Sequence, residues 1–224
     1  MNVTLFIPLC GRVDIWQKHL SQFLENQYWV HSSVKLILCD TSNDQEFGRI
    51  LKQWLSQCDY PHNEYVAFPN TKPTDDLSLS NLCCDIYNVA AEAATTEYTW
   101  IVEDDVIPPL NAAVRLISNF NDLVGSCSGV YHFKNNPALY MAWLDDTYHL
   151  IPKDSEKIDS SGTQLVRGTG FGCVMIRSSE LYGYKFPHFD KLIPSFDHTF
   201  FDRMTLRKIL DWSVVCQHLG MREW

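Results

Sequence analysis

The sequence predicts an α/β fold: one domain built on a mostly parallel central sheet with helices on its faces. Two observations predict it. Strand-like and helix-like segments alternate through the first half of the chain, and the 224 residues are 46% apolar and 20% charged, as in ordinary globular proteins. A chain of this length can bury a sizeable core within one domain. We therefore expect a single domain over residues 1–224, with a regular half over 1–108 and a more irregular half over 109–224.

Four segments of the regular half have the character of strands. VTLFIP (3–8), EYVAF (64–68) and YTWIV (98–102) are short apolar runs, and VKLILCD (34–40) is a continuous apolar run typical of a strand buried on both faces. Because helix-like segments separate them, we expect these strands to be parallel.

Three helices are expected between these strands, over residues 15–27, about 42–57 and about 80–95. In the second, apolar residues recur at helical spacing, and Ser42 with Gln45 offers a capping box at its start. The apolar set of this helix is Phe47, Ile50, Leu51, Trp54 and Leu55.

The second half of the chain is less regular. We expect a helix near 111–120, another over 196–210 and a strand over 212–218, with several short strands between the two helices. Those short strands are SGVYHF, ALYMAWL, TYHLI and GCVMIR. There is no internal repeat and no linker, so this half is expected to be a smaller mixed subregion of the same domain.

Charge and hydropathy exclude several classes of protein. The net charge of −9 works against a partner bound through its phosphate backbone, so we expect no nucleic acid. No apolar stretch reaches the roughly 18 residues of a membrane span, and MNVTLFIPLCGR lacks the basic residues that begin a signal peptide. We expect no transmembrane segment, while peripheral association with a membrane stays open.

The eight cysteines show no CxxC pair and no zinc-like spacing. Cys39 and Cys216 lie inside strand-like apolar runs, where a free thiol behaves as a small hydrophobic group. We expect reduced thiols in a cytoplasmic protein, and disulfides are the alternative.

Three consecutive carboxylates, Glu103, Asp104 and Asp105, follow the predicted strand 98–102. Adjacent like charges repel one another, so their grouping calls for a positive partner, and a cation is the first candidate. They fall at the carboxyl end of a parallel strand, where open α/β sheets bind ligands. The alternative is an exposed strand end whose acids are merely solvated.

Four segments in order resemble the GT-A fold glycosyltransferases, most closely the large family 2 type. VTLFIPLCGR is similar to the family's first strand and basic loop, and KLILCDTSND to its second strand ending in Asp. NVAAEAATTEYTWIVEDDVIPP matches the helix, turn and DxD-bearing strand, and FDKLIPSFDHTFFDRM resembles the later acidic segment. Two departures are Glu103 in place of the first Asp, and Phe196 where a Glu is usual. The resemblance implies a GT-A-like fold with a Rossmann-like sheet.

The resemblance also implies a divalent metal site for Mn²⁺ or Mg²⁺. Its ligands would be Asp105 and Glu103 of the acidic motif, completed by His218 after the last strand. A hard cation held by oxygen ligands neutralises the diphosphate that leaves from a nucleotide sugar. For His218, a lone surface histidine is the alternative.

A nucleotide site is implied over the regular half. Pro8 and Arg12 lie at the end of the first strand and in its loop, Asp40 would accept hydrogen bonds from the base or ribose, and Asp104 would lie close to the ribose. A cap of its own loop is the alternative for Asp40, and the two roles can coexist. A phosphatase-type aspartyl nucleophile is disfavoured because Ser42 stands where a second Asp is needed.

The irregular half would bind the acceptor. Asp197 is the candidate general base, since an acceptor hydroxyl is a poor nucleophile until its proton is taken. An N-cap of the helix near residue 196 is the alternative for Asp197. Thr169 and Gly170 in RGTGFG would let a sugar or acceptor approach closely, and a glycine-rich hairpin turn is the alternative there.

Together these residues predict a metal-dependent transfer of a sugar from a nucleotide sugar, with a UDP-sugar as the expected donor, to a hydroxyl of a glycan or another acceptor. Inversion by direct displacement is expected by analogy with family 2. Two other classes stay open: a sugar-nucleotide-forming nucleotidyltransferase, although PLCGRVD has one Gly and one Arg where a basic, glycine-rich loop is usual, and a non-catalytic carbohydrate-binding domain derived from a glycosyltransferase.

Overall fold

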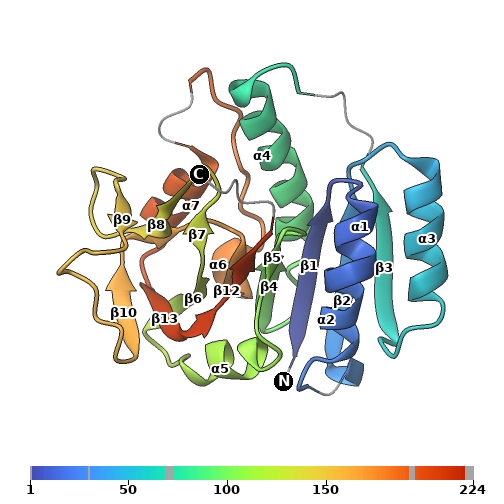
Figure 1. Ribbon diagram of the computed structural model, residues 1–224, viewed down its shortest axis with the longest axis horizontal. Coiled ribbons are helices and arrows are strands. Elements are labelled where there is room, and N and C mark those ends of the chain that lie inside the picture. Colours follow the sequence, from blue (N-terminus) through green and yellow to red (C-terminus); the bar gives the residue numbers. More distant parts are fainter. Residues whose placement is uncertain (1, 30, 69–72, 192–194, 220–224) are drawn as a thin grey trace.

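An eight-stranded sheet carries the fold (Figure 1). The computed structural model describes residues 2–29, 31–68, 73–191 and 195–219. In spatial order the strands of the sheet are β10 (Thr163–Val166), β13 (Arg207–Val215), β6 (Val124–Val130), β12 (Cys173–Arg177), β4 (Tyr98–Val102), β1 (Val3–Leu9), β2 (Val34–Asp40) and β3 (His62–Ala67).

The sheet is mostly parallel, as predicted. β1 pairs in parallel with both β2 and β4, β2 with β3, and β13 with β6. The antiparallel pairs are made by β12, which lies between β4 and β6, and by β10 at the edge. Because β4 of the first half pairs with β12 of the second, the two halves share one sheet. β1 begins near the N marker and runs upward in Figure 1, so the carboxyl ends of its parallel neighbours lie at the upper edge.

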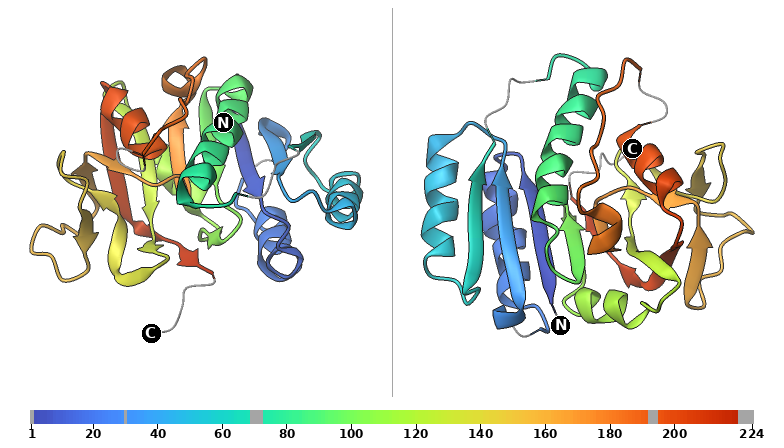
Figure 2. Two further views of the ribbon diagram at one scale, coloured as in Figure 1. Left: turned by 90° about the horizontal axis from the view of Figure 1, so that it is seen from above. Right: turned by 180° about the vertical axis from the view of Figure 1, so that it is seen from behind.

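Helices cover both faces of the sheet (Figure 2). One face carries α1 (Val13–Ile15), which continues through a π-helical stretch (Trp16–Leu20) into α2 (Ser21–Glu25), together with α3 (Gln45–Leu55) and α5 (Ala112–Ser118). The other face carries α4 (Asp76–Ala93), α6 (Ser178–Leu181) and α7 (Phe196–Arg203). A short 3₁₀ turn (His31–Ser33) precedes β2.

The alternation of side chains along β1 builds the two cores. Leu5 and Ile7 belong to the cluster that includes α2 and α3, whereas Phe6 packs with α4 and α7. All three are fully buried. The central strands are thus buried on both faces, which explains their unbroken apolar sequences.

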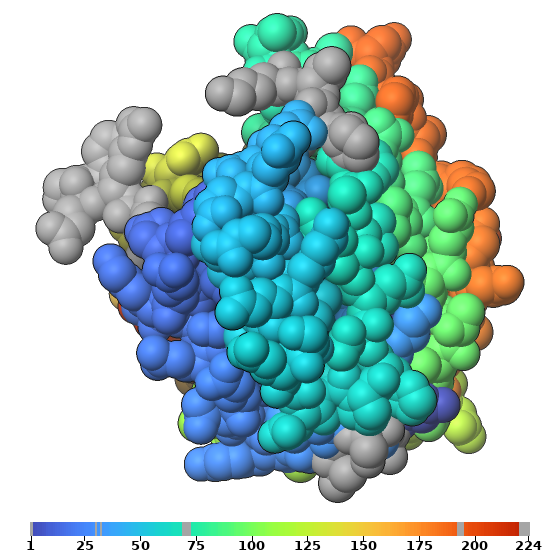
Figure 3. Space-filling view, turned by 90° about the vertical axis from the view of Figure 1, so that its right-hand side faces the viewer, coloured from blue at the N-terminus to red at the C-terminus, as the bar shows by residue number. Residues whose placement is uncertain are grey.

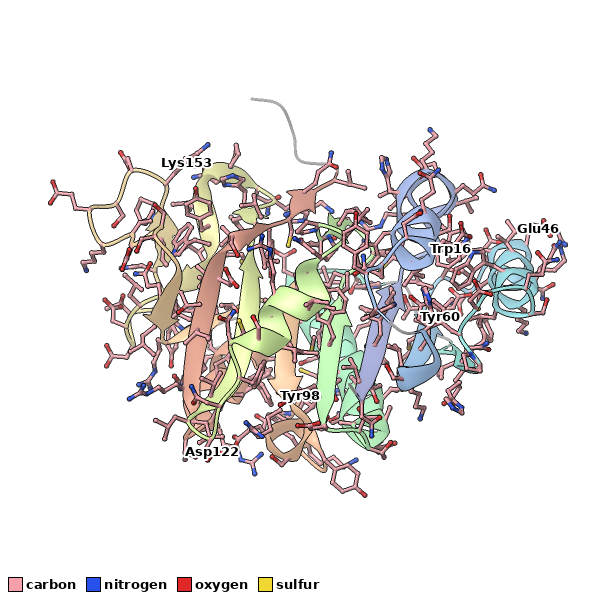
Figure 4. The ribbon with its side chains drawn as sticks, turned by 90° about the horizontal axis from the view of Figure 1, so that it is seen from below. Trp16, Glu46, Tyr60, Tyr98, Asp122 and Lys153 are labelled. Atoms are coloured by element: carbon pink, nitrogen blue, oxygen red, sulfur yellow. The ribbon has the colours of Figure 1, made fainter. Side chains whose placement is uncertain are left out.

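The end of the molecule that carries α3 is closed by aromatic side chains. The rings of Trp16 and Trp54 meet edge to face with centroids 5.2 Å apart, and the ring of Tyr60 lies 6.4 Å from that of Trp54. Figure 4 shows Glu46 on the far side of α3, and the outer surface of this helix faces the viewer in Figure 3. These ring contacts join the first helical segment, α3 and the segment before β3.

Two small sheets lie beside the main one. In the first, β8 (Asn136–Trp143) pairs with β7 (His132–Phe133), β9 (Leu150–Pro152) and β11 (Gly168–Thr169). In the second, β14 (Gln217–His218) pairs with β5 (Val106–Ile107). The strand pairs of these two sheets are antiparallel, and except for β5 their strands come from residues 109–224.

Two predicted features of the helices are wrong. The N-cap of α3 is Asp44, whose side chain accepts from the N–H groups of Glu46 and Phe47, so the Ser42–Gln45 box does not form. Helix α7 ends at Arg203, and β13 begins at Arg207. Pairing of β13 with β6 overrides the helical pattern there.

The segment RGTGFG, residues 167–172, does not form a hairpin turn. It contains β11, which pairs with β8, a strand distant in sequence. The nearby strand β10 was not expected from the polar stretch before it.

The cysteine prediction is confirmed as far as pairing goes, since all eight thiols are free. Within the described ranges, no helix combines the length and apolar character needed to span a membrane.

Candidate active site

The acidic motif lies in the turn between β4 and β5. The N–H of Val106 donates to the carbonyl of Glu103 at 3.0 Å, and the N–H of Glu103 donates to the carbonyl of Gly172 at 3.0 Å, which fixes the turn against the neighbouring strand segment. Asp104 and Asp105 are only 3% and 5% exposed. The motif is thus a buried group of charges rather than a solvated strand end, which excludes that alternative.

Arg12 binds both buried aspartates. Its Nε donates to Asp104 Oδ2 at 3.2 Å, its Nη2 pairs with Asp104 Oδ1, and its Nη1 donates to Asp105 Oδ2 at 2.6 Å. The N–H of Cys10 adds a bond to Asp104 Oδ2 at 2.9 Å. The loop reaches this position through Gly11, whose φ of +78° suits glycine and whose absent Cβ would lie 2.6 Å from Ser42.

Asp105 also contacts two groups from the second half of the chain. Lys134 Nζ lies 2.6 Å from Asp105 Oδ2, and His218 Nε2 lies 3.7 Å from Asp105 Oδ1. Burial alone would raise the pKa of Asp105, but His218, Arg12 and Lys134 together hold it well below its usual range. Asp105 is therefore an ionised, ion-paired carboxylate.

His218 is oriented by the β5–β14 ribbon. It lies opposite Val106 in that pairing, and the N–H of Leu219 donates to the carbonyl of Asp105 at 2.7 Å. Its Nδ1 lies 2.7 Å from the carbonyl oxygen of His132, which can only accept, so Nδ1 carries the proton. Burial favours a lower pKa for His218, but the bonds to Asp105 and to the His132 carbonyl outweigh it and raise the pKa.

These atoms fit a divalent cation in part. A tautomer fixed through Nδ1 leaves Nε2 as a possible ligand, the usual arrangement for metal-binding histidines. Asp105 Oδ1 is the carboxylate oxygen on the same side. One oxygen of Glu103 is already engaged, because its Oε1 accepts from the hydroxyl of Tyr87 at 2.7 Å. Among the described residues, no three His, Cys, Asp or Glu side chains form a ready metal cluster. A metal would thus need oxygen ligands from water or substrate in addition to Asp105 and His218.

A cavity of about 200 Å³ joins the acidic motif to the candidate base. The sequence-predicted residues on its wall are Glu103, Asp105, Gly170, Asp197 and His218. The remaining wall is largely aromatic and apolar, with one cation: Tyr131, Phe133, Lys134, Met141, Phe171 and Phe196. Residues from the β4–β5 turn, the β7–β8 hairpin, α7 and β14 therefore meet in one place.

Asp197 is buried at the start of α7 but is not its cap. Ser195 is the N-cap and forms a capping box with His198. Asp197 Oδ1 accepts from the N–H of His198 at 2.9 Å and from the Ser195 hydroxyl. In the part of the chain that the structure describes, Asp197 Oδ2 has no hydrogen-bond partner, so this oxygen is available to a ligand in the cavity.

Thr169 and Gly170, the two candidate residues in RGTGFG, differ in their contact with the cavity. Gly170 lines the cavity, and a Cβ there would lie 2.6 Å from the Tyr131 hydroxyl, so close packing against Tyr131 requires glycine. Thr169 is 2% exposed, its hydroxyl donates to the carbonyl of Gly170 at 3.1 Å, and it is not on the cavity wall. Only Gly170 of this pair lies where a sugar could reach it.

A second cavity of about 250 Å³ lies beside the end of β2. Asp40 is on its wall together with Tyr65, Lys52 and Gly48. Asp40 Oδ1 accepts from the N–H and hydroxyl of Ser42 at 2.9 and 2.6 Å, and Oδ2 accepts from the Tyr65 hydroxyl at 2.8 Å. Asp40 therefore caps its own loop and also faces a cavity.

Pro8 is buried in β1 opposite Cys39 of β2 and lines neither cavity. Sequence reasoning missed Lys134, Tyr65 and Tyr87. A single lysine in a short polar hairpin and two tyrosines in ordinary elements carry no pattern, and only the fold brings them to the carboxylates.

Solved structures resemble this chain over nearly its whole length. The mannosyltransferase PcManGT from Pyrobaculum calidifontis, in complex with GDP-Man and Mn²⁺, superposes with a TM-score of 0.63 and 16% identity over 96% of this chain and 56% of its own. GalNAc-T7 with UDP, GalNAc and Mn²⁺ gives 0.59 and 10% identity over 99% of this chain and 45% of its own. A197 from STIV gives 0.54 and 16% identity over 98% and 86%.

The fold is that of GT-A glycosyltransferases. At such identities the likeness concerns the fold alone, and this chain spans about half the length of the two named transferases. No protein-family model matches the sequence, and a search of curated protein sequences finds no match.

Proposed function

We propose that the protein is a metal-dependent glycosyltransferase that moves a sugar from a nucleotide sugar to a hydroxyl of a glycan or other acceptor, with inversion. The observation that carries this proposal is the shared cavity of Asp105, His218 and Asp197. A displacement with a diphosphate leaving group requires two things: groups that hold a counter-charge for the diphosphate, and a base for the acceptor hydroxyl. Asp105 and His218 lie at one end of the cavity, and the unpaired oxygen of Asp197 lies at the other.

The residues would divide the work as follows. Asp105 and His218 would hold Mn²⁺ or Mg²⁺, which when bound supplies positive charge for the leaving diphosphate. Arg12 holds both aspartates in position through its three bonds. It helps to lower the pKa of Asp105, whereas burial leaves the pKa of Asp104 raised in spite of Arg12. Asp197 Oδ2 would accept the proton of the acceptor hydroxyl as the new glycosidic bond forms.

The nucleoside would lie across the carboxyl edge of the sheet. We propose that Asp40 and Tyr65 contact the base or ribose, because their cavity is at the end of β2 on the same edge as the acidic motif. We propose a UDP-sugar as donor. GalNAc-T7, which shares the fold, was solved with UDP, whereas PcManGT was solved with GDP-Man, so a guanine nucleotide is the alternative to test.

The family 2 type and a cytoplasmic location remain parts of this proposal. The ordered motifs support the first, and eight free cysteines, which suit a reducing compartment, support the second.

The test is donor turnover with and without Mn²⁺ over a panel of UDP- and GDP-sugars. The expected result is slow, metal-dependent release of one nucleoside diphosphate, which becomes faster when an acceptor glycan is supplied. The anomeric configuration of the product, read by NMR, decides inversion. Formation of a nucleoside triphosphate and a sugar 1-phosphate when pyrophosphate is added would identify a nucleotidyltransferase instead, and binding of sugars without turnover would identify a non-catalytic domain.

A further inference from the structure

Lys134 extends from the β7–β8 hairpin to the acidic motif. Its Nζ lies 2.6 Å from Asp105 Oδ2, the same oxygen that accepts from Arg12 Nη1 at 2.6 Å. Lys134 lines the cavity that also holds Asp197 and His218. The carboxylate proposed to hold the metal thus pairs with two of the chain's own cations.

The two cations are held very differently. Arg12 is anchored by bonds to both Asp104 and Asp105, and its side chain is 31% exposed. Lys134 is 42% exposed, and Asp105 is its one ion-pair partner among the described residues. A lysine ammonium on a four-carbon stem is a flexible, strongly hydrated point charge, whereas a bidentate guanidinium is geometrically fixed. Lys134 is therefore the cation that can leave.

A divalent cation beside Asp105 would make that departure favourable. Asp105 Oδ1 and His218 Nε2, 3.7 Å apart, form the edge that it would bind. Lys134, on the other oxygen of the same carboxylate, would then repel the divalent cation and compete with it for Asp105. The diphosphate brought by a nucleotide is the nearest new anion that a displaced ammonium would meet in the same cavity.

We propose that Lys134 is a diphosphate-binding residue that occupies Asp105 in the free protein, competes there with the divalent cation, and transfers to the diphosphate when cation and nucleotide bind together. This inference rests on the proposed function, because it takes a nucleoside diphosphate as the ligand. It assigns to the β7–β8 hairpin, which no sequence motif marks, a direct part in binding.

Titration calorimetry on Lys134→Met tests the competition with the cation and the contact with the diphosphate separately. Mn²⁺ alone should bind about tenfold more tightly than to the parent, because the competing ammonium is gone. UDP or GDP, titrated at saturating Mn²⁺, should bind about tenfold more weakly, because the diphosphate loses a counter-charge. Lys134→Arg should restore most of the affinity for the nucleotide. Lys157→Met, an exposed lysine beyond β9 with the same change in charge, should alter neither affinity.

Tighter binding of Mn²⁺ together with weaker binding of the nucleotide distinguishes the proposed role of Lys134 from a purely structural one. Loss of a purely structural lysine would weaken both affinities. Unchanged or weaker Mn²⁺ binding by Lys134→Met overturns the competition, and an unchanged affinity for UDP and GDP overturns the contact with the diphosphate. A parent protein that binds neither nucleotide in Mn²⁺ overturns the proposed function along with this inference. A parent that binds one of them, with no response to Lys134→Met, overturns this inference alone.

Discussion

The two cavities at the carboxyl edge of the sheet hold their carboxylates in opposite ways. Asp40 is satisfied by neutral donors, the Ser42 amide and hydroxyl and the Tyr65 phenol. Asp105 is satisfied by charged groups, Arg12 and Lys134, with His218 close by. A neutral ligand can enter beside Asp40 with no exchange of charge. A ligand at Asp105 must replace or rearrange cations, so selectivity for charge belongs to the Asp105 cavity and selectivity for shape to the Asp40 cavity.

The largest effect is expected from Asp105→Ala. Transfer should fall by roughly a thousandfold or more, since the leaving diphosphate loses its counter-charge. The sequence suggests that removing one of three adjacent acids relieves repulsion and leaves the melting temperature equal or higher. The ion pairs reverse that expectation: the melting temperature should be lower by a few degrees, because the partly exposed cations Arg12 and Lys134 lose their buried partner.

Activity assays in Mn²⁺ and thermal melts without metal check this prediction. Asp122→Ala, an exposed acid far from the motif (Figure 4), is the control and should match the parent in both. Near-parental transfer by Asp105→Ala would remove Asp105 from the site.

Asp197→Asn should lower transfer by about a hundredfold or more while leaving the affinities for Mn²⁺ and nucleoside diphosphate unchanged, because its partner is the acceptor. The amide oxygen can still accept from the N–H of His198, so the start of α7 is preserved. Ser195→Ala removes the capping box with His198 and the hydroxyl that donates to Asp197. It should cost about 1 kcal/mol in unfolding free energy and lower transfer much less than Asp197→Asn does. Transfer by Asp197→Asn at the parental rate would assign the base to another group.

Gly48→Ala tests the Asp40 cavity. A Cβ at Gly48 would lie 2.6 Å from the Tyr65 hydroxyl and 3.4 Å from Asp40 Oδ2, so the phenol must shift away from Asp40. Nucleotide affinity measured by calorimetry should fall about tenfold, while Mn²⁺ affinity without nucleotide should stay the same. Gly162→Ala, where the new Cβ meets nothing within 4 Å, is the matched control. If both variants bind nucleotide like the parent, the Asp40 cavity is not the nucleoside site.

The smallest effect is a dependence of stability on pH. Burial, with the charge of Asp105 beside it, raises the pKa of Glu103 from its ordinary 4.5 to about 7. The folded protein therefore binds this proton more tightly than the unfolded chain, so the stability contributed by Glu103 is full below about pH 4.5 and is lost as pH rises through 7.

Glu103→Gln keeps an acceptor for Tyr87 and cannot ionise. Its melting temperature should exceed that of the parent by a few degrees at pH 8, and the difference should close by pH 5. Glu156→Gln, an exposed site, should show no such trend. A constant difference at every pH would mean that Glu103 does not titrate in this range.

Much of the regular half could be predicted from the sequence because its signals are local. Buried parallel strands such as β2 appear as continuous apolar runs, and the acidic motif at the end of β4 could be placed at the sheet's edge from strand order alone. The cap of α3 was missed because Ser42 and Asp44 are both good caps, and Ser42 is used instead to hold Asp40.

The partners of the carboxylates could not be predicted in the same way. Lys134 is 29 residues from Asp105 and Tyr87 is 16 residues from Glu103, and nothing in the sequence around either marks the contact. The turn from α7 into β13 was missed for a related reason. Lys208 donates to the carbonyls of Phe201 and Met204 at the end of α7, and that bond forms only once β13 is paired with β6.

The pairing of β5 with β14 brings together site residues that are synthesised at different times. Asp105 and its clamp Arg12 are synthesised early, whereas His218 is joined to them only after 217 preceding residues exist. The residues of the Asp40 cavity and of the Arg12–Asp104 pair therefore all exist before the imidazole does. A chain truncated before β14 would lack half of the pair proposed to hold the metal.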